Sequence, residues 1–266
     1  MKAPFSVVIT RDIIVARGAD TRSFLHSQLS NDIASMAVGS SRYSFVLEPT
    51  GKLCALLRVR CVAGDHFVID VDEHCGERAL ARLNKFKIRV KCEFQLATVR
   101  AVALRGLDSA GRETALALQG AVSAWRETDG AVDLFGDANQ SLGALPADLR
   151  AYEAERVRCA WPVFGTDIDD DSIPAETSLV DVCVSFTKGC YPGQELVERM
   201  DSRGSTAPRR LMRLPARTAN GFTATVGESY VVGDKSFGRC TSVAGEFALV
   251  MVTRAHLGEA EALVSP

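Results

Sequence analysis

Eight consecutive residues, 188–195, constrain the local fold of this chain more tightly than any other stretch. Their sequence is Lys-Gly-Cys-Tyr-Pro-Gly-Gln-Glu, called the octet below. Proline presets φ at one turn position and the following glycine accepts a positive φ, so a tight turn is expected at 191–193. Apolar and polar residues alternate over 180–186, which predicts a strand, and 194–200 has an apolar side at helical spacing. The octet is therefore expected to join a strand to a helix.

Cys190 falls at this junction, close to a predicted helix N-terminus and two residues after Lys188. The partial positive charge of a helix start and a nearby ammonium group both favour a thiolate. An isolated cysteine at such a place is also often a small buried side chain that closes a turn. The residues alone leave both interpretations open.

Short predicted strands make up much of the chain. Residues 43–48, 53–62 and 66–71 have strand character, and apolar residues at helical spacing predict a helix over about 73–86. Strands with one helix between them indicate a small α+β region, ferredoxin-like in type, over 43–144.

The two ends of the chain have their own patterns. Two short strands are expected over 6–9 and 13–17, around a turn at 11–12, followed by a helix over 22–29. Short strands with glycine-bearing turns recur over 204–266, which predicts a small antiparallel β-barrel.

Composition excludes several classes of protein. With 47% hydrophobic and 24% charged residues, the 266-residue chain resembles an ordinary globular protein. Its net charge of −2 predicts neither nucleic-acid nor acidic-membrane binding. We expect no signal peptide, no membrane span and a cytoplasmic location. None of the eight cysteines forms a Cys-x-x-Cys pair, so no metal site is predicted and most thiols are expected in the core.

The octet resembles the signature of the YgfZ-type tetrahydrofolate-binding proteins. These are relatives of glycine-cleavage aminomethyltransferase, and their bacterial and mitochondrial members assist iron–sulfur cluster assembly. The family pattern is Lys-Gly-Cys-Tyr/Phe-x-Gly-Gln-Glu, and all seven specified positions are met. The stretches 24–39 and 237–242 resemble other family phrases, whereas Arg158-Cys159-Ala160 stands where relatives commonly have Glu-Ala-Gly.

The resemblance implies an α+β, aminomethyltransferase-like (GcvT-like) folate-binding fold. On this basis we expect a discontinuous folate-binding domain from residues 1–42 and 145–203. The ferredoxin-like region then spans 43–144, and the C-terminal β-barrel spans 204–266.

The resemblance also implies a site for tetrahydrofolate or a one-carbon derivative, with Cys190 as the functional thiol. The residues expected to bind the cofactor are Asn31, Arg156, Lys188, Tyr191, Gly193, Gln194 and Glu195. Gln194 or Glu195 suits the amide and amine edge of a pterin, on which Tyr191 could stack. Arg156 or Lys188 suits the carboxylates of the tail. Structural alternatives stay open, since the amide and acid can cap a helix, Asn31 can end one and Arg156 can be exposed.

One departure from the aminomethyltransferases bears on activity. Those enzymes carry an Asp-Asp pair shortly after the glycine of the turn that is here 49–51, where this chain has Cys54 and Ala55. No carboxylate is left there to guide proton transfer, and Cys54 is expected in the core. We therefore expect a tetrahydrofolate-binding accessory protein with iron–sulfur client or assembly proteins as partners. The alternatives are a folate-dependent aminomethyl or one-carbon transferase and a thiol enzyme unrelated to folate.

Overall fold

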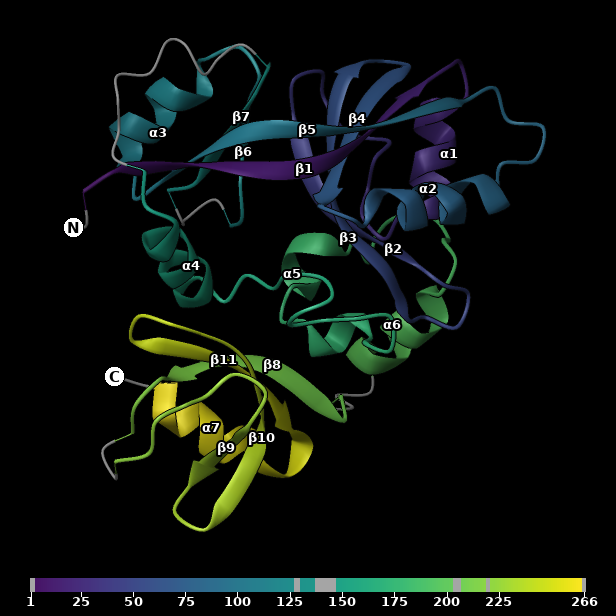
Figure 1. The fold of residues 1–266 in the computed structure, drawn as a ribbon. Helices are drawn as coiled ribbons and strands as arrows, with labels where there is room; N and C mark the ends of the chain where they lie inside the picture. Colours follow the sequence, from purple (N-terminus) through teal and green to yellow (C-terminus); the bar gives the residue numbers. More distant parts are fainter. Residues whose placement is uncertain (1–2, 127–129, 137–146, 203–206, 219–220, 265–266) are drawn as a thin grey trace.

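A computed structural model describes residues 3–126, 130–136, 147–202, 207–218 and 221–264. Two antiparallel sheets lie at opposite ends of the molecule, with helices between them (Figure 1). The larger sheet has the order β2-β3-β4-β1-β5-β7-β6. Its strands are β1 (Phe5–Arg17), β2 (Ser41–Leu47), β3 (Leu53–Ala63), β4 (His66–Asp72), β5 (Glu93–Arg105), β6 (Ala121–Ser123) and β7 (Val132–Phe135). The smaller sheet has the order β8-β11-β10-β9, with β8 (Arg209–Pro215), β9 (Ser229–Val232), β10 (Lys235–Ala244) and β11 (Phe247–Thr253).

The helices divide into those that pack on a sheet and those that lie between the sheets (Figure 1). Packed on the sheets are α1 (Thr21–Gln28), α2 (Gly76–Lys85), α3 (Ser109–Leu116) and α7 (Leu257–Val264). Between the sheets lie α4 (Leu149–Arg158), α5 (Val180–Cys183) and α6 (Gln194–Ser202). Two 3₁₀ turns complete the set, at Pro174–Glu176 and Arg254–His256. The helices expected over 22–29, 73–86 and 194–200 are confirmed.

The N-terminal segment forms one strand, so the expectation of two strands around a turn at 11–12 is wrong. β1 pairs with β5 without interruption from Phe5 to Arg17 and also with β4. Arg11 stays in the strand because its guanidinium bonds to two carboxylates of β4, Asp70 and Asp72. β1 lies in the middle of the sheet, between β4 and β5, and the domain boundary at residue 42 stays a prediction. The boundaries predicted at 144–145 and 203–204 lie outside the described residues.

The segment before the octet is helical, so the strand predicted over 180–186 is also wrong. The backbone N–H groups of Val182 and Cys183 bond to the carbonyl of Leu179, which closes the single turn of α5. From Val184 the chain is extended, and Ser185 N–H bonds to the carbonyl of Ser30 rather than to a sheet. A run of four alternating apolar residues is short enough for such tertiary contacts to override its period.

The C-terminal part keeps the antiparallel pairing that was predicted, but its described strands form an open four-stranded sheet. No ladder joins β8 to β9 in the described part of the chain, so the closure of a barrel is not seen. α7 packs against β8 and β11, and a core around Tyr230 and Phe237 fills the space beneath.

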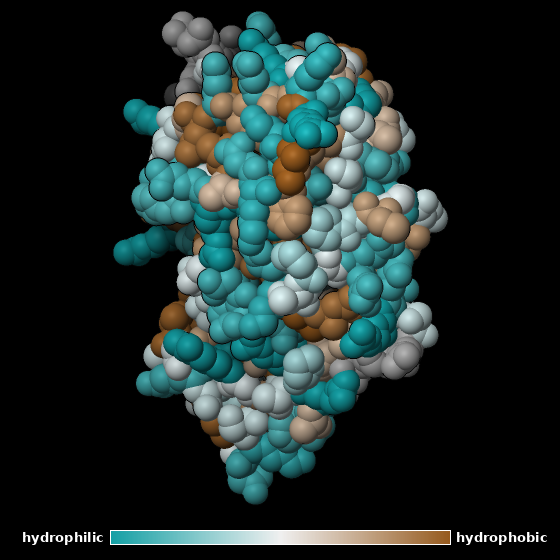
Figure 2. Space-filling view, turned by 90° about the vertical axis from the view of Figure 1, so that its right-hand side faces the viewer, coloured by the Kyte–Doolittle hydropathy of each residue, from teal (hydrophilic) through white to brown (hydrophobic). Residues whose placement is uncertain are grey.

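The surface is mixed in polarity. In the face shown in Figure 2, apolar residues form separate patches among hydrophilic ones. Within the described residues, no helix combines the length and the apolar character that a membrane span requires.

Candidate functional site

The octet is held against the turn between β2 and β3 by two glycines. Gly193 has φ +85°, as the predicted turn requires, and a Cβ built there would lie 2.7 Å from the carbonyl oxygen of Glu48. A Cβ on Gly51 would lie 2.6 Å from the Leu196 side chain. Neither position has room for a side chain, so the two turns pack backbone to backbone.

Lys188 ties the octet to the end of α1. Its ammonium donates hydrogen bonds to the carbonyls of His26 and Leu29, which the helix leaves unpaired at its C-terminus. The ammonium also lies 4.9 Å from the ring centre of Tyr191. Burial lowers the pKa of Lys188 to about 8, against the opposing effect of the Asp32 carboxylate and the Cys190 sulfur.

Residues 30–31 join the end of α1 to α5. The Ser30 hydroxyl donates to the carbonyl of Cys183 over 2.7 Å. The side-chain amide of Asn31 donates to the carbonyls of Tyr43 and Val182, over 2.8 and 2.9 Å. Segments about 150 residues apart in the chain are thus joined next to the octet by the side chains of Ser30 and Asn31.

The other predicted octet residues have different surroundings. The Tyr191 ring is only 6% exposed, and burial raises the pKa of its hydroxyl to about 12. Gln194, the first residue of α6, accepts a hydrogen bond from the backbone N–H of Tyr191 in the preceding turn and donates to Glu198 one turn along the helix. Glu195 is exposed. The buried and bonded residues hold the shape of the octet, and the carboxylate faces solvent.

Cys190 is exposed, whereas the other seven cysteines are buried. Cys54 is 3% exposed and Ala55 is fully buried, so the expectation that Cys54 belongs to the core is confirmed. In the described part of the chain, no group of three or more histidine, cysteine or acidic side chains is arranged to hold a metal ion. Among the thiols, only that of Cys190 is open to a partner in this conformation.

Arg156 lies away from the octet, at the junction with the smaller sheet. Its guanidinium is 4% exposed and bonds to Glu153, the carbonyl of Trp161, Asp167 and Ser242 of β10. All three nitrogens therefore have protein partners. Burial opposes the charge, but the carboxylates of Asp167 and Glu153 outweigh it and raise the pKa of the guanidinium. In the structure, Arg156 therefore connects α4 to β10 of the smaller sheet.

A cavity of about 840 Å³ lies beside Asn31, between the start of β2, α3, β6 and α5. Its lining includes the aromatic rings of Tyr43 and Trp125, the carboxylate of Asp181 and the guanidinium groups of Arg42, Arg112 and Arg126. The Tyr43 hydroxyl accepts a hydrogen bond from the backbone N–H of Trp125 over 3.0 Å, which fixes two of the walls relative to each other. This volume is in the range of pockets for small organic ligands. The chemistry of the lining suits a flat ring that carries anionic groups.

A buried charge network next to this cavity was missed by sequence reasoning. Arg58, 1% exposed, bonds to Asp70 over 2.8 Å and pairs with Asp133 over 3.0 Å, and Arg105 pairs with Asp133 over 2.9 Å. Burial alone would raise the pKa of Asp133, but Arg105 and Arg58 hold it below its usual value. The available signal was Arg58, which together with Arg60 interrupts the apolar residues of the predicted strand 53–62.

Comparisons with known proteins give a consistent picture, although no protein-family model matches the chain. The chain is 27% identical over 195 residues to an uncharacterized protein of Haemophilus influenzae, with 73% of this chain and 67% of that protein covered. It is 25% identical to the tRNA-modifying protein YgfZ of Vibrio vulnificus, covering 88% and 75%. A mitochondrial iron–sulfur cluster assembly factor IBA57 homolog of Neurospora crassa is 26% identical, covering 79% of this chain but 53% of that protein.

Among solved structures, glycine cleavage system aminomethyltransferase T from Bartonella henselae matches with a TM-score of 0.72 at 17% identity, covering 94% of this chain and 79% of that one. The fold is therefore that of the aminomethyltransferases, as predicted. Among the proteins compared, the chain is similar to the YgfZ proteins and to an IBA57 homolog, which agrees with the resemblance of its octet.

Proposed function

We propose that this protein is a tetrahydrofolate-binding accessory factor that supports the assembly or repair of iron–sulfur proteins, with Cys190 as its functional thiol. The observation that carries the proposal is the exposure of Cys190 within the family octet, while every other cysteine is buried. The name of the Neurospora relative supports the iron–sulfur context. Other relatives are named for tRNA modification, but the net charge of −2 does not favour direct tRNA binding.

The surroundings of Cys190 support its use as a thiol. Glycines and the Lys188 hydrogen bonds fix the loop, so the sulfur is presented on a rigid support rather than on a mobile tail. A rigid, exposed cysteine sulfur can attack an electrophile or serve as a soft metal ligand for a partner's cluster.

We place the folate in the cavity of about 840 Å³ beside Asn31. The pterin ring would stack against Tyr43 or Trp125, with Asp181 as acceptor for its amide and amine edge. The carboxylates of the tail would pair with Arg42 or Arg112. Of the residues predicted from sequence, Asn31 would act here as a positioning residue, because it bonds to the carbonyls of two residues that line the cavity.

The thiol is tested by Cys190→Ser, with Thr187→Ala as a control for a change at an exposed position of the same loop. The serine variant should fold and bind tetrahydrofolate as the wild type does, because the proposed folate contacts do not use sulfur. It should fail to restore iron–sulfur enzyme activity in cells that lack the protein, while the control restores it. Full restoration by Cys190→Ser would overturn the role of the thiol.

The folate site is tested by calorimetry with tetrahydrofolate. Arg112→Gln removes one cavity guanidinium and should weaken binding about tenfold, which corresponds to about 1.4 kcal/mol. Arg150→Gln removes an exposed charge on α4 and should leave the affinity unchanged. Equal affinities in the two variants would place the folate elsewhere, and no heat at millimolar folate would contradict folate binding itself.

Folate-dependent one-carbon transfer is the second candidate, because the fold is shared with an aminomethyltransferase. The apolar, buried pair Cys54 and Ala55 argues against it, since no carboxylate is available at that place to guide proton transfer. Turnover of a lipoyl-bound aminomethyl group with a kcat of about 1 s⁻¹ or more would favour this candidate over the first.

A further inference from the structure

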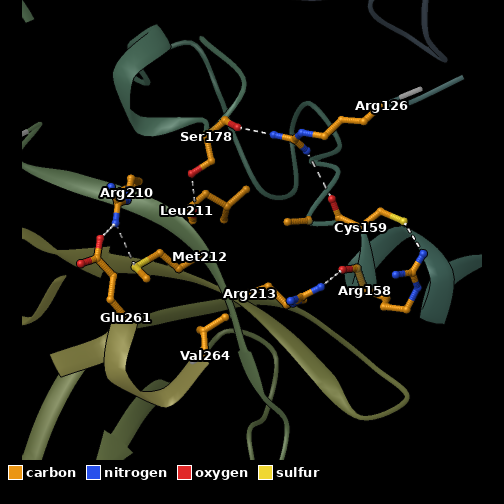
Figure 3. Close-up of a pocket in the computed structure, with 11 residues that line it drawn as sticks. Arg126, Arg158, Cys159, Ser178, Arg210, Leu211, Met212, Arg213, Glu261 and Val264 are labelled. Atoms are coloured by element: carbon orange, nitrogen blue, oxygen red, sulfur yellow. Dashed lines mark hydrogen bonds and ion pairs between the residues drawn. The ribbon is translucent and has the colours of Figure 1, made fainter. Parts of the chain in front are cut away.

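A second pocket, of about 690 Å³, lies where the smaller sheet meets the end of α4 (Figure 3). Its lining comes from both parts of the molecule, with α4 and the following residues on one side and β8 and α7 on the other. Four of the lining residues are arginines and one is a glutamate, in a chain whose net charge is negative. The arginines are Arg126, Arg158, Arg210 and Arg213.

Two of these guanidinium groups are held in place by backbone carbonyls at or near the pocket, two of which lie at the C-terminal end of α4. Arg213 donates to the carbonyl of Arg158, and Arg126 donates to the carbonyls of Cys159 and Ser178 (Figure 3). The guanidinium of Arg126 also pairs with the carboxylate of Asp181 over 3.7 Å, whereas the carbonyl that binds Arg213 orients its guanidinium without a full charge to neutralise it. Both side chains are thus pre-oriented at the pocket, which lowers the entropic cost of binding an anion.

Arg213 is the arginine whose charge is least compensated. Arg210 pairs with Glu261, Arg158 with Glu155 and Arg126 with Asp181. The contacts of Arg213 in the described part of the chain are the Arg158 carbonyl and the ring of Phe247, at 4.8 Å, and no carboxylate is among them. An incoming anion would therefore meet a cation without having to displace a carboxylate.

The pocket is also too large and too apolar on one side for a bare inorganic ion. Leu211, Met212 and Val264 line the side formed by β8 and α7, and the volume matches that of pockets for small organic ligands. We propose that this pocket binds a small organic phosphate monoester, with its phosphate at Arg213 and its apolar body against Val264. A phosphate offers three strong acceptor oxygens to guanidinium groups that approach from different elements, whereas a carboxylate has two oxygens in one plane.

Calorimetry on the full chain with phenyl phosphate tests the proposal, with inorganic phosphate and benzoate as comparison probes. Phenyl phosphate should bind at least tenfold more tightly than inorganic phosphate, which lacks the apolar body, and than benzoate, which lacks the third oxygen. Arg213→Gln should weaken its binding at least tenfold, and Arg217→Gln, which removes an exposed charge outside the pocket, should not change it.

Arg213→Gln also removes the hydrogen bond to the Arg158 carbonyl at the end of α4. A second pair of variants therefore tests the pocket without changing that contact. Val264 is 38% exposed at the end of α7, so Val264→Glu and Val264→Lys should both fold. The glutamate should weaken phenyl phosphate binding by repulsion and the lysine should strengthen it. Absence of binding to the wild type at millimolar probe, equal binding of benzoate, or identical affinities in the two Val264 variants would each overturn the proposal. Tetrahydrofolate binding is measured separately and does not enter this outcome.

Discussion

Replacing Gly193 by alanine should destabilise the protein and disturb the octet. The substitution has two costs. Alanine at φ +85° costs about 1–2 kcal/mol, because L-residues with a Cβ avoid left-handed backbone conformations. Its Cβ would also lie 2.7 Å from the carbonyl oxygen of Glu48 and 3.0 Å from the Cα of Gly51. Both are backbone atoms, so the relief of this overlap requires a backbone shift that costs about 1–3 kcal/mol. The expected loss in the free energy of unfolding is about 2–5 kcal/mol.

Alanine substitutions at two other glycines distinguish the conformational cost from the cost of steric overlap. Gly165 has φ +87° and nothing within 4 Å of the place that a Cβ would take, so Gly165→Ala should show the conformational cost alone, about 1–2 kcal/mol. Gly189 lies in the octet, outside the left-handed region and with open space around it. Gly189→Ala should therefore be neutral, or stabilising by up to about 1 kcal/mol, because alanine restricts the unfolded chain.

Urea unfolding followed by tryptophan fluorescence measures all three variants. The predicted order of stability is Gly189→Ala, then Gly165→Ala, then Gly193→Ala. If Gly193→Ala loses no more stability than Gly165→Ala, the octet and the β2–β3 turn do not make the close backbone contact at Gly193.

Three further predictions concern buried charge and thiol exposure. Arg58→Met should cost about 3–5 kcal/mol in urea unfolding because it removes one of the two arginine partners of each buried carboxylate, Asp70 and Asp133, whereas Lys52→Met, at an exposed ion pair, should change little. Asp133 has a lowered pKa when folded, so its contribution is complete above about pH 4, the pKa of an unfolded aspartate, and is lost as pH falls through the folded value. Asp133→Asn should weaken this acid dependence, and an unchanged pH profile would contradict the assignment. In the native protein, iodoacetamide should alkylate the exposed Cys190 first and Cys54 slowly. Burial shields the Cys54 thiol and raises its pKa. Equal alkylation rates would contradict the difference in exposure between the two cysteines.

The sequence alone determined the features that depend on local backbone chemistry. The positive φ of Gly193 and the helix after the octet follow from residue types, and both are confirmed. The family signature is equally local, since seven specified positions lie within eight residues. The burial of Cys54 could be predicted from its apolar neighbours, because a strand of such composition is stable only in a core.

Which groups face one another depends on how the elements pack in three dimensions. The alternating residues before the octet form α5, because bonds from Ser30 and Asn31 to the carbonyls of α5 favour a helical turn there. Arg156 has a suitable residue type for a folate tail, but its neighbours on other elements bind all three of its nitrogens. The periodicity of apolar residues indicates which face of a single helix or strand is buried. The partner of a buried charge or of a loop carbonyl depends on contacts between elements that are distant in the chain. These contacts arise only when the sheets and helices pack together.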